Sequence, residues 1–585
     1  MKLILLVTTL ILSTSIFIFG QGTIVPFGND AYHIMDRLEI KTGIPTPFHS
    51  SLKYYLRRDV ANYAMQVDTI FDGLSILDVR DLNYIFRDNN EWLGLTEFPT
   101  TLVGPKEGEE SVAKMSRSEK RYFAREKPIL KYFYRTPANF YEAHTKHFHL
   151  KINPMIDFKF AQDSEDAELV FLNRRGIEIR GGIDDRIFFY SNIVESQARF
   201  PSYVNRRVNR DLALPGQGLY KSYKSTIFNI TNGYDYLNSE SYLGFNVTKH
   251  VGVQLGYGKN KIGEGERSLL LSDFANNYLY LKLNTRVWKF HYQNIFAELS
   301  PVGSRNIRGD NLLPKKYMAA HYLNFNLTKN LTIGLYEAVM FSRNDRFEFQ
   351  YLNPLIFYRT VEGFIGSPDN VLIGTNIKWN LFNRFQLYGQ LILDEFKFDE
   401  LFIERRGWWG NKYGIQAGVK YIDVFGIDHL DAQVEYNQAR PYTYTHRDSS
   451  ASYSHYNQPL AHPLGANFKE VLVKLRYQPF HKLVFDSRIL FMDYGEDTNL
   501  ENWGSNVLTN HNTRVQEFEN EIGQGVGTNT IIIGLDASYQ IYHNMYIDAH
   551  FFYRKMNSEN DALDNTTNYI GGGFRMNIGK TRMDF

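Results

Sequence analysis

The chain has 585 residues, of which 43% are hydrophobic and 15% aromatic, and its formal net charge is +1. A charge so close to zero gives no electrostatic reason to expect nucleic acid as a partner. Cysteine is absent, which excludes disulfides, thiol chemistry, cysteine-ligated metals and a lipidated cysteine anchor.

The chain begins with an apolar run at residues 3–19, directly behind Lys2. This pattern is typical of a secretory signal peptide, and Gly20 offers a small residue for cleavage. We therefore assign residues 1–20 to a signal peptide, with an uncleaved anchor helix as the alternative. No later apolar run reaches 18 residues, so the sequence does not predict a membrane protein built from helices.

The next segment, residues 21–142, has a helical pattern. Apolar residues recur at helical spacing over 30–40, 59–71 and 78–86, and 116–127 is a fourth, strongly charged candidate helix. We interpret this segment as a small periplasmic helical region and a candidate plug for the lower end of a barrel. An ordinary soluble domain tethered there is the alternative.

From residue 143 to residue 585 the period changes from helical to alternating. One row of a candidate strand holds Ile531, Ile533 and Leu535, while Gly534 and Asp536 belong to the opposite row. Such segments reach about 10 residues, the length that a tilted strand needs to cross a bilayer. The pattern predicts an all-β fold, a transmembrane antiparallel β-barrel with lipid on one face of each strand and a polar lumen on the other.

The connections between the candidate strands support this fold. Short turns alternate with long polar loops along the chain, as in barrels with tight periplasmic turns and long outer loops. The tally is about 18 strands, an even number that keeps both ends of the chain in the periplasm. They start near Phe148, Glu168, Ile187, Asn238, Val251, Asn277, Val287, Tyr317, Leu331, Val371, Phe385, Lys412, His429, Phe468, Leu483, Asn529, Met545 and Asn568.

The last predicted strand runs through Ile570 and Ile578 to Phe585. A terminal aromatic residue resembles the signal that the barrel-insertion machinery reads. The expected location is therefore the outer membrane of a Gram-negative bacterium, with the lipid bilayer and this machinery as partners.

Enzyme motifs are missing from the sequence. It contains no nucleophile elbow, no zinc-protease motif and no phosphate loop. A serine site near His550 and Asp548 is conceivable, but satisfied polar networks are commoner in a lumen. The acidic segment 557–568 lacks EF-hand spacing and is expected to be a solvated loop. We predict a protein that is not an enzyme and has no cofactor and no metal.

Three segments carry candidate binding residues. The segment 261–273 is expected to fold into the barrel mouth, with Arg267 available to bind a ligand or to pair internally. Trp408 and Trp409 suit carbohydrate, because indole faces stack on sugar C–H groups; the alternative is an aromatic girdle at the membrane boundary. The Tyr-rich segment with Tyr442, Tyr444 and Tyr456 could stack on a glycan or pack on itself.

Several segments together resemble the capsule assembly Wzi family. They read GYGKNKIGEGERSLLLSDFA, KKYMAAHYL, LTIGLYEAVMFSR, YLNPLIFYRTVE, SPDNVLIG, LILDEF, WWGNKYGIQAGV and YNQPLAHPLGANFKE. The resemblance covers roughly residues 25–585, and the branch looks like that of Bacteroidota, which includes gliding-motility-associated relatives. It implies an 18-stranded barrel that acts as a surface lectin and helps retain capsular or other exported polysaccharide. It assigns no individual sugar-binding residues.

Three functional hypotheses follow from these observations. The first is a non-enzymatic barrel that binds cell-surface polysaccharide. The second is a structural accessory of gliding-motility or protein-secretion machinery, with other outer-membrane proteins as candidate partners. The third is a pore or transporter.

Overall fold

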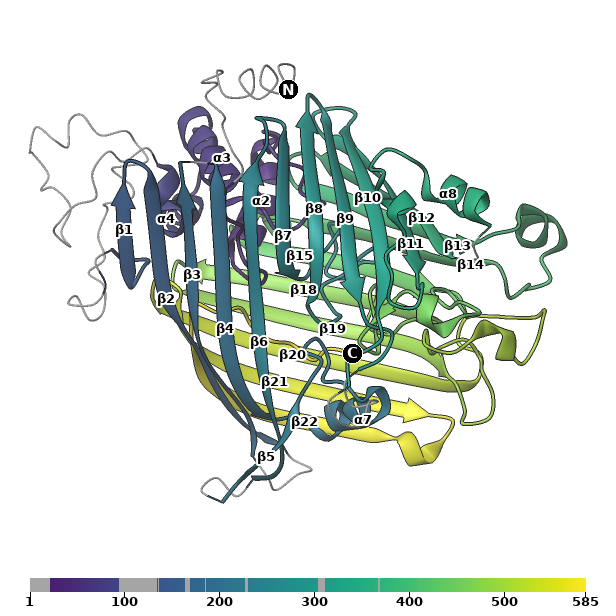
Figure 1. Ribbon diagram of the computed structural model, residues 1–585. Coiled ribbons are helices and arrows are strands. Elements are labelled where there is room, and N and C mark those ends of the chain that lie inside the picture. Colours follow the sequence, from purple (N-terminus) through teal and green to yellow (C-terminus); the bar gives the residue numbers. More distant parts are fainter. Residues whose placement is uncertain are drawn as a thin grey trace, which may run out of the picture.

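The computed structural model describes residues 22–93, 134, 136–163, 169–184, 186–226, 230–303, 311–366 and 369–585. They form a closed antiparallel barrel of 18 strands (Figure 1). The strands of the wall are β2 (Phe148–Asp163), β3 (Val170–Ile183), β4 (Ile187–Arg199), β6 (Ile230–Asn246), β7 (Val251–Gly258), β8 (Tyr278–Val287), β9 (Phe290–Leu299), β10 (Lys316–Asn326), β11 (Leu331–Phe341), β12 (Asn370–Leu381), β13 (Phe385–Glu395), β14 (Lys412–Tyr421), β15 (Leu430–Ala439), β18 (Phe468–Phe480), β19 (Leu483–Glu496), β20 (Val526–Tyr542), β21 (Met545–Ser558) and β22 (Asn565–Met576).

The predicted fold and strand tally are confirmed. Most of the predicted strand starts lie within three residues of the observed ones. The exception is β6, which begins at Ile230 rather than near Asn238 because its first residues pair with an extra strand, β5 (Lys221–Ser225). A second extra strand, β1 (Tyr141–Thr145), pairs with residues 148–152 of β2, which precede the part of β2 that pairs with β22. Strands β16 (Ser454–His455) and β17 (Gln458–Pro459) form a separate small hairpin within a loop.

The barrel closes where β22 pairs with β2. This pairing leaves no free sheet edge along the closed part of the wall, as a strand structure in lipid requires. Outward-facing residues such as Leu335, Ile377 and Leu535 are apolar and exposed, whereas Asp548 and Arg575 face the lumen. Among the described residues, none of the helices has the length and apolarity to cross a bilayer.

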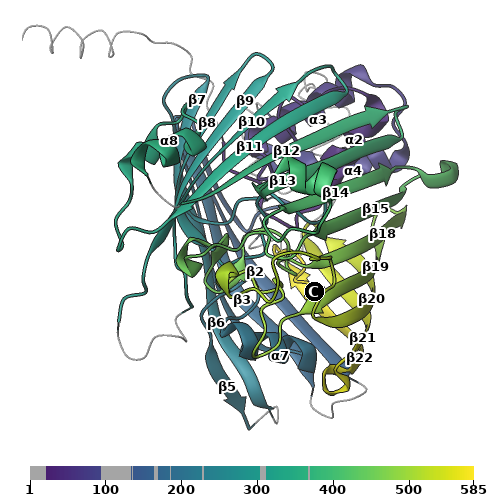
Figure 2. The ribbon, with the colours of Figure 1, turned by 90° about the vertical axis from the view of Figure 1, so that its right-hand side faces the viewer.

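The two ends of the barrel differ. Short connections such as 543–544 and 481–482 lie at one end, here called the tight-turn end. Long connections such as 440–467 and 497–525 lie at the other, here called the loop end. Figure 2 shows the helices of the N-terminal region together near the tight-turn end.

The N-terminal region contains three described helices, α2 (Ala31–Thr42), α3 (Arg57–Ile70) and α4 (Ile76–Asp88), where the sequence predicts them. Gly43 ends α2 in a left-handed conformation at φ 66°, and Ser75 caps α4 with a capping box. Their apolar faces form a shared core. The predicted helix at 116–127 and the apolar run at 3–19 lie outside the described residues.

The helices are seated in the lumen. The Ile24 amide donates to the hydroxyl of Tyr242, which faces inward from β6, and the Lys378 ammonium of β12 lies 2.7 Å from the Glu39 carboxylate. The Asn324 amide of β10 donates to the Ser51 hydroxyl. Residues 22–93, here called the plug, therefore contact inward-facing residues of the wall at the tight-turn end.

The end of the chain differs from the prediction. Strand β22 stops at Met576, and Phe585 is not its last residue. Asn577 adopts a positive φ of 53° and its amide donates to the Asn544 carbonyl, which turns the chain away from the wall. Residues 577–585 then run inside the lumen, where Phe585 is 7% exposed and packs against Tyr203 and Phe274.

Candidate functional site

Two indole rings lie together at the loop end, held by three loops. Trp408 and Trp409 precede β14, their ring centroids are 5.8 Å apart, and both are half-buried. Both indole N–H groups donate to one carboxylate oxygen of Glu517, at 3.0 and 2.9 Å. The backbone amide of Trp409 also donates to the Glu517 carbonyl. Glu517 belongs to the loop between β19 and β20, so it ties the two loops to each other.

Cations surround this pair. The Arg514 guanidinium lies 4.2 Å from the Trp409 ring centroid, and the Lys397 ammonium lies 4.2 Å from that of Trp408. Arg440, from the third loop, donates to the Trp408 carbonyl at 3.5 Å. Cations over indole faces are attracted by the ring quadrupole. We call Trp408, Trp409, Lys397, Arg514 and Glu517 the tryptophan cluster.

The protonation states of Glu517 and of the neighbouring His511 determine the charge at the tryptophan cluster. Burial would raise the pKa of Glu517, but its bonds with Arg514, Trp408 and Trp409 lower it, so it is a carboxylate at neutral pH. Burial and the nearby Lys412 lower the pKa of His511 to about 3, which keeps this imidazole neutral beside Trp409. The cluster therefore combines two half-buried indole rings, two cations and one carboxylate, groups that suit hydroxyl-rich or acidic ligands.

The predicted tyrosines lie deeper. Tyr442 and Tyr444 are 0% exposed, and their hydroxyls donate to the carbonyls of Asn502 and Leu269, both at 2.8 Å. Burial raises the pKa of Tyr442 to about 12. Tyr456 is 7% exposed. Tyr442 and Tyr444 therefore pack within the loops, and a role of these tyrosines in glycan binding stays a prediction.

Arg267 is also internal. The segment 261–273 folds into the barrel as predicted, and Leu269, Leu270 and Leu271 are fully buried there. The Arg267 guanidinium donates to Glu470 at 3.2 Å and to the Asp584 carbonyl at 2.5 Å. Burial would lower the pKa of Arg267, but Glu470 and Asp584 raise it. Of the two roles predicted for this side chain, the structure shows the internal pairing.

A cavity of about 610 Å³ remains in the lumen between the plug, the segment 261–273 and the C-terminal residues. Its lining is strongly charged and mostly paired. The Lys474 ammonium and the Arg488 guanidinium contact the Glu266 carboxylate at 2.5 and 2.6 Å, and Lys580 contacts Asp486 at 3.1 Å. The charged residues of the lining are Asp30, Asp36, Arg37, Lys53, Arg174, Glu240, Lys259, Lys261, Glu264, Glu266, Arg267, Asp273, Lys420, Asp431, Lys474, Arg476, Asp486, Arg488, Arg575, Lys580, Arg582 and Asp584.

The serine and the histidine of the conceivable serine site contact two different carboxylates. The Ser538 hydroxyl donates to Asp548 at 2.5 Å, whereas the His550 imidazole contacts Asp536 at 2.5 Å. A nucleophilic serine needs a base that accepts its own proton. Because the Ser538 hydroxyl donates to a carboxylate and not to the imidazole, these residues form a polar network of the wall.

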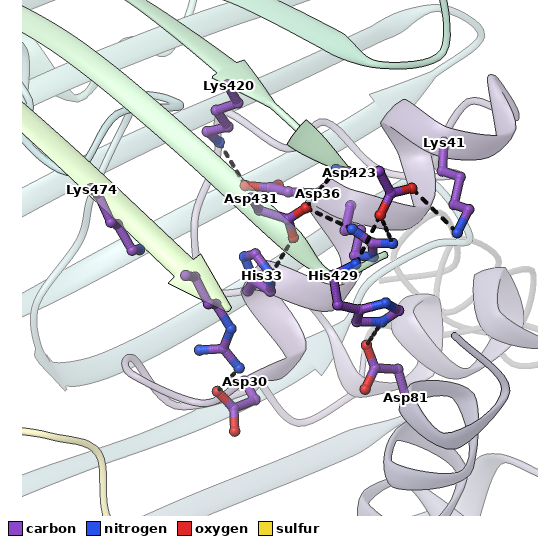
Figure 3. A network of polar contacts seen from close by, with 12 residues as sticks. Asp30, His33, Asp36, Lys41, Asp81, Lys420, Asp423, His429, Asp431 and Lys474 are labelled. Atoms are coloured by element: carbon purple, nitrogen blue, oxygen red, sulfur yellow. Dashed lines mark hydrogen bonds and ion pairs between the residues drawn. The ribbon is translucent and has the colours of Figure 1, made fainter. Parts of the chain in front are cut away.

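A dense ionic network joins the plug to the wall (Figure 3). The Arg37 guanidinium of α2 contacts Asp431, Asp423, Asp78 and Asp428, at 2.6, 2.5, 3.3 and 3.3 Å. Asp423 and Asp428 lie in the turn between β14 and β15.

Two further side chains, Lys41 and His429, extend this network. Lys41 contacts Asp78, and the His429 imidazole lies 3.3 Å from Asp81. Asp78, Asp428 and His429 could together face a metal ion, but Arg37 contacts both carboxylates. We call the acidic residues around Arg37, together with Lys41 and His429, the plug latch.

The sequence did not single out the partners of the two indoles. Glu517, Arg514 and Lys397 come from segments with no motif, and Glu517 and Arg514 are more than 100 residues from Trp408. Lys397 shares the loop of the two Trp residues, whereas Arg514 and Glu517 come near only through the pairing of the intervening strands. The one local signal was the Trp408–Trp409 pair itself.

One comparison shows the fold of this chain in a solved structure. It is that of Wzi from Escherichia coli, described as an outer membrane protein involved in group 1 capsule assembly and a carbohydrate-binding β-barrel. The sequence identity is 12%, the match covers 96% of this chain and 100% of that chain, and the TM-score is 0.55. Searches with protein-family models and against curated protein sequences gave no match.

Lower similarities connect the chain with other outer-membrane barrels. OprD from Pseudomonas aeruginosa has 9% identity, with 73% of this chain and 94% of that chain covered and a TM-score of 0.40. OccAB2 from Acinetobacter baumannii has 9% identity, 73% and 97% coverage and a TM-score of 0.40.

Proposed function

We propose that this protein is an outer-membrane barrel of a Gram-negative bacterium that binds or retains exported polysaccharide at the cell surface. The tight-turn end and the plug then lie in the periplasm, after removal of residues 1–20, and the loop end faces outward. The protein is not an enzyme and needs no cofactor. Membership of the Wzi family, in a Bacteroidota branch, is part of this proposal.

The tryptophan cluster is the observation that supports glycan binding best. It lies at the loop end, is half-buried rather than covered, and combines two indoles with fixed cations. The overall similarity to a barrel described as carbohydrate binding agrees with this function. The plug and the C-terminal residues fill much of the lumen, which favours retention at the surface over passage through the barrel.

Binding of polysaccharide extracted from the native cell surface tests this proposal. We expect the purified protein to bind the extract, and Trp408→Ala with Trp409→Ala to weaken binding at least about 30-fold, because buried Trp anchors commonly contribute about 2 kcal/mol or more. Trp288→Ala is the matched control, since this Trp is 78% exposed at the tight-turn end. Equal binding by all variants would contradict the role of the cluster.

The two other hypotheses give different results. A structural accessory of motility or secretion machinery would show no glycan affinity and would co-purify with a large membrane complex of other outer-membrane proteins. A pore or transporter would show sustained single-channel openings in planar bilayers. We expect neither.

A further inference from the structure

Residues 342–366, which follow β11, pack against the outer face of the wall and do not stand above the barrel mouth. They contain η3 (Phe349–Leu352) and α8 (Tyr358–Ile365), and Figure 2 shows α8 outside the barrel wall. Their buried residues form an apolar cluster with outward-facing wall residues. The members of this cluster are Phe296, Tyr317, Ala319, Val339, Phe341, Tyr351, Tyr358, Val361 and Val371. We call this segment the strap.

The wall beneath the strap carries an unusual polar pair. His321 of β10 and Glu337 of β11 are cross-strand partners, and the imidazole lies 2.8 Å from the carboxylate. Their neighbours Ala320 and Ala338 belong to the lumen cluster, so this pair points outward. Charged groups on the lipid face of a barrel are destabilising at bilayer depth, so the pair needs a cover.

The strap supplies that cover through hydrogen bonds. The backbone amides of Tyr358 and Arg359, at the start of α8, each donate to a carboxylate oxygen of Glu337 at 3.0 Å. The Tyr358 ring stacks on His321 with centroids 4.5 Å apart. The Pro354 carbonyl accepts from the Tyr292 hydroxyl and, at 3.1 Å, from the Asn294 amide, both on the outer face of β9.

The other face of the strap exposes large apolar side chains, together with Arg359, which is 69% exposed and pairs with Glu362. Phe349 is 76% exposed, Leu355 80%, Phe357 72% and Phe364 80%. Four large apolar side chains on one short segment are not what a water-exposed loop presents. The wall strand beneath the strap, β11, also exposes apolar residues such as Leu335 at 57%.

The height of the strap places it within the apolar band. Glu337 is the seventh residue of β11, counted from the tight-turn end. At about 3.3 Å per residue and a tilt of about 40°, it lies about 15 Å along the barrel axis. The apolar band of such barrels is about 25 Å tall, so the strap lies in its outer half.

We propose that the strap is a membrane-embedded element whose exposed phenylalanines and Leu355 contact lipid acyl chains in the outer leaflet, while its inner face shields His321 and Glu337. This inference rests on the outer-membrane location proposed above. The strap thus adds a lipid-contacting surface to one side of the barrel. Its helix lies along the wall instead of crossing the bilayer.

Spin labelling tests this proposal, and the absence of cysteine makes every introduced cysteine unique. Phe357→Cys and Phe364→Cys are labelled with a nitroxide, and the full chain is reconstituted into palmitoyl-oleoyl phosphatidylcholine vesicles. Collisions with oxygen, which partitions into the bilayer, are compared with collisions with a water-soluble nickel chelate. Leu335→Cys is the wall control, and Leu500→Cys, 95% exposed in a loop-end connection, is the water control.

We expect positions 357 and 364 to resemble position 335, with oxygen collisions exceeding nickel collisions. A profile like that of position 500 would overturn the inference, because the strap would then be in water. Low accessibility to both reagents would also overturn it, because protein would then cover this face. If position 335 itself collides mainly with nickel, the membrane location fails, and this result is distinct from failure of the strap alone.

Discussion

The plug latch makes a sharp prediction for Arg37→Ala. Arg37 is 1% exposed and contacts four carboxylates. Removing the guanidinium leaves these carboxylates close together where water is scarce. Lys41 and the nearby histidines then remain to reduce the repulsion between their negative charges. Loss of one partner from a buried ion pair costs about 3–5 kcal/mol. Docking of the plug should therefore weaken by about two to more than three orders of magnitude.

Amide hydrogen exchange over α2 and α3 measures this effect, because undocking precedes exchange of these helices. We expect exchange in Arg37→Ala to accelerate there, while the strands of the wall keep their protection. Arg175→Ala is the matched control: its pair with Glu195 has side-chain exposures of 49% and 55%, and such surface pairs contribute about 0–1 kcal/mol. Equal exchange in the two variants would refute the reasoning.

Two further predictions concern the same lumen. Burial would raise the pKa of Asp78, but Arg37 and Lys41 lower it below its ordinary 3.8. The stabilisation from ionised Asp78 is therefore full above pH 3.8 and is lost as the pH falls through the lower, folded value. Protease protection of the plug should decline below about pH 4, and unchanged protection from pH 4 to pH 2 would contradict this. Phe585→Ala should remove a buried ring that also lies under the Arg207 guanidinium, 4.5 Å from the ring centroid, at a cost of about 3 kcal/mol. Faster amide exchange over α7 (Ser202–Asp211) with unchanged exchange in α2 is the expected result, and unchanged exchange in α7 would contradict it.

The sequence by itself determined the barrel. Alternation such as Leu535 against Asp536 has a period of two, and a side chain in a barrel wall can face only lipid or lumen. The alternation of short and long connections then indicated that successive strands are antiparallel and that one end of the barrel carries the tight turns. The helices of the plug followed from the 3.6-residue period of their apolar residues.

The tertiary structure decided everything that depends on long-range pairing. Whether Arg267 binds a ligand or pairs internally depends on Glu470 and Asp584, more than 200 residues away. The fate of Phe585 depends on a turn at Asn577 that no alternation pattern encodes. The strap lies on the wall because Glu337 accepts two amides from α8. Local period carries no information about such contacts, which form only when the chain has folded.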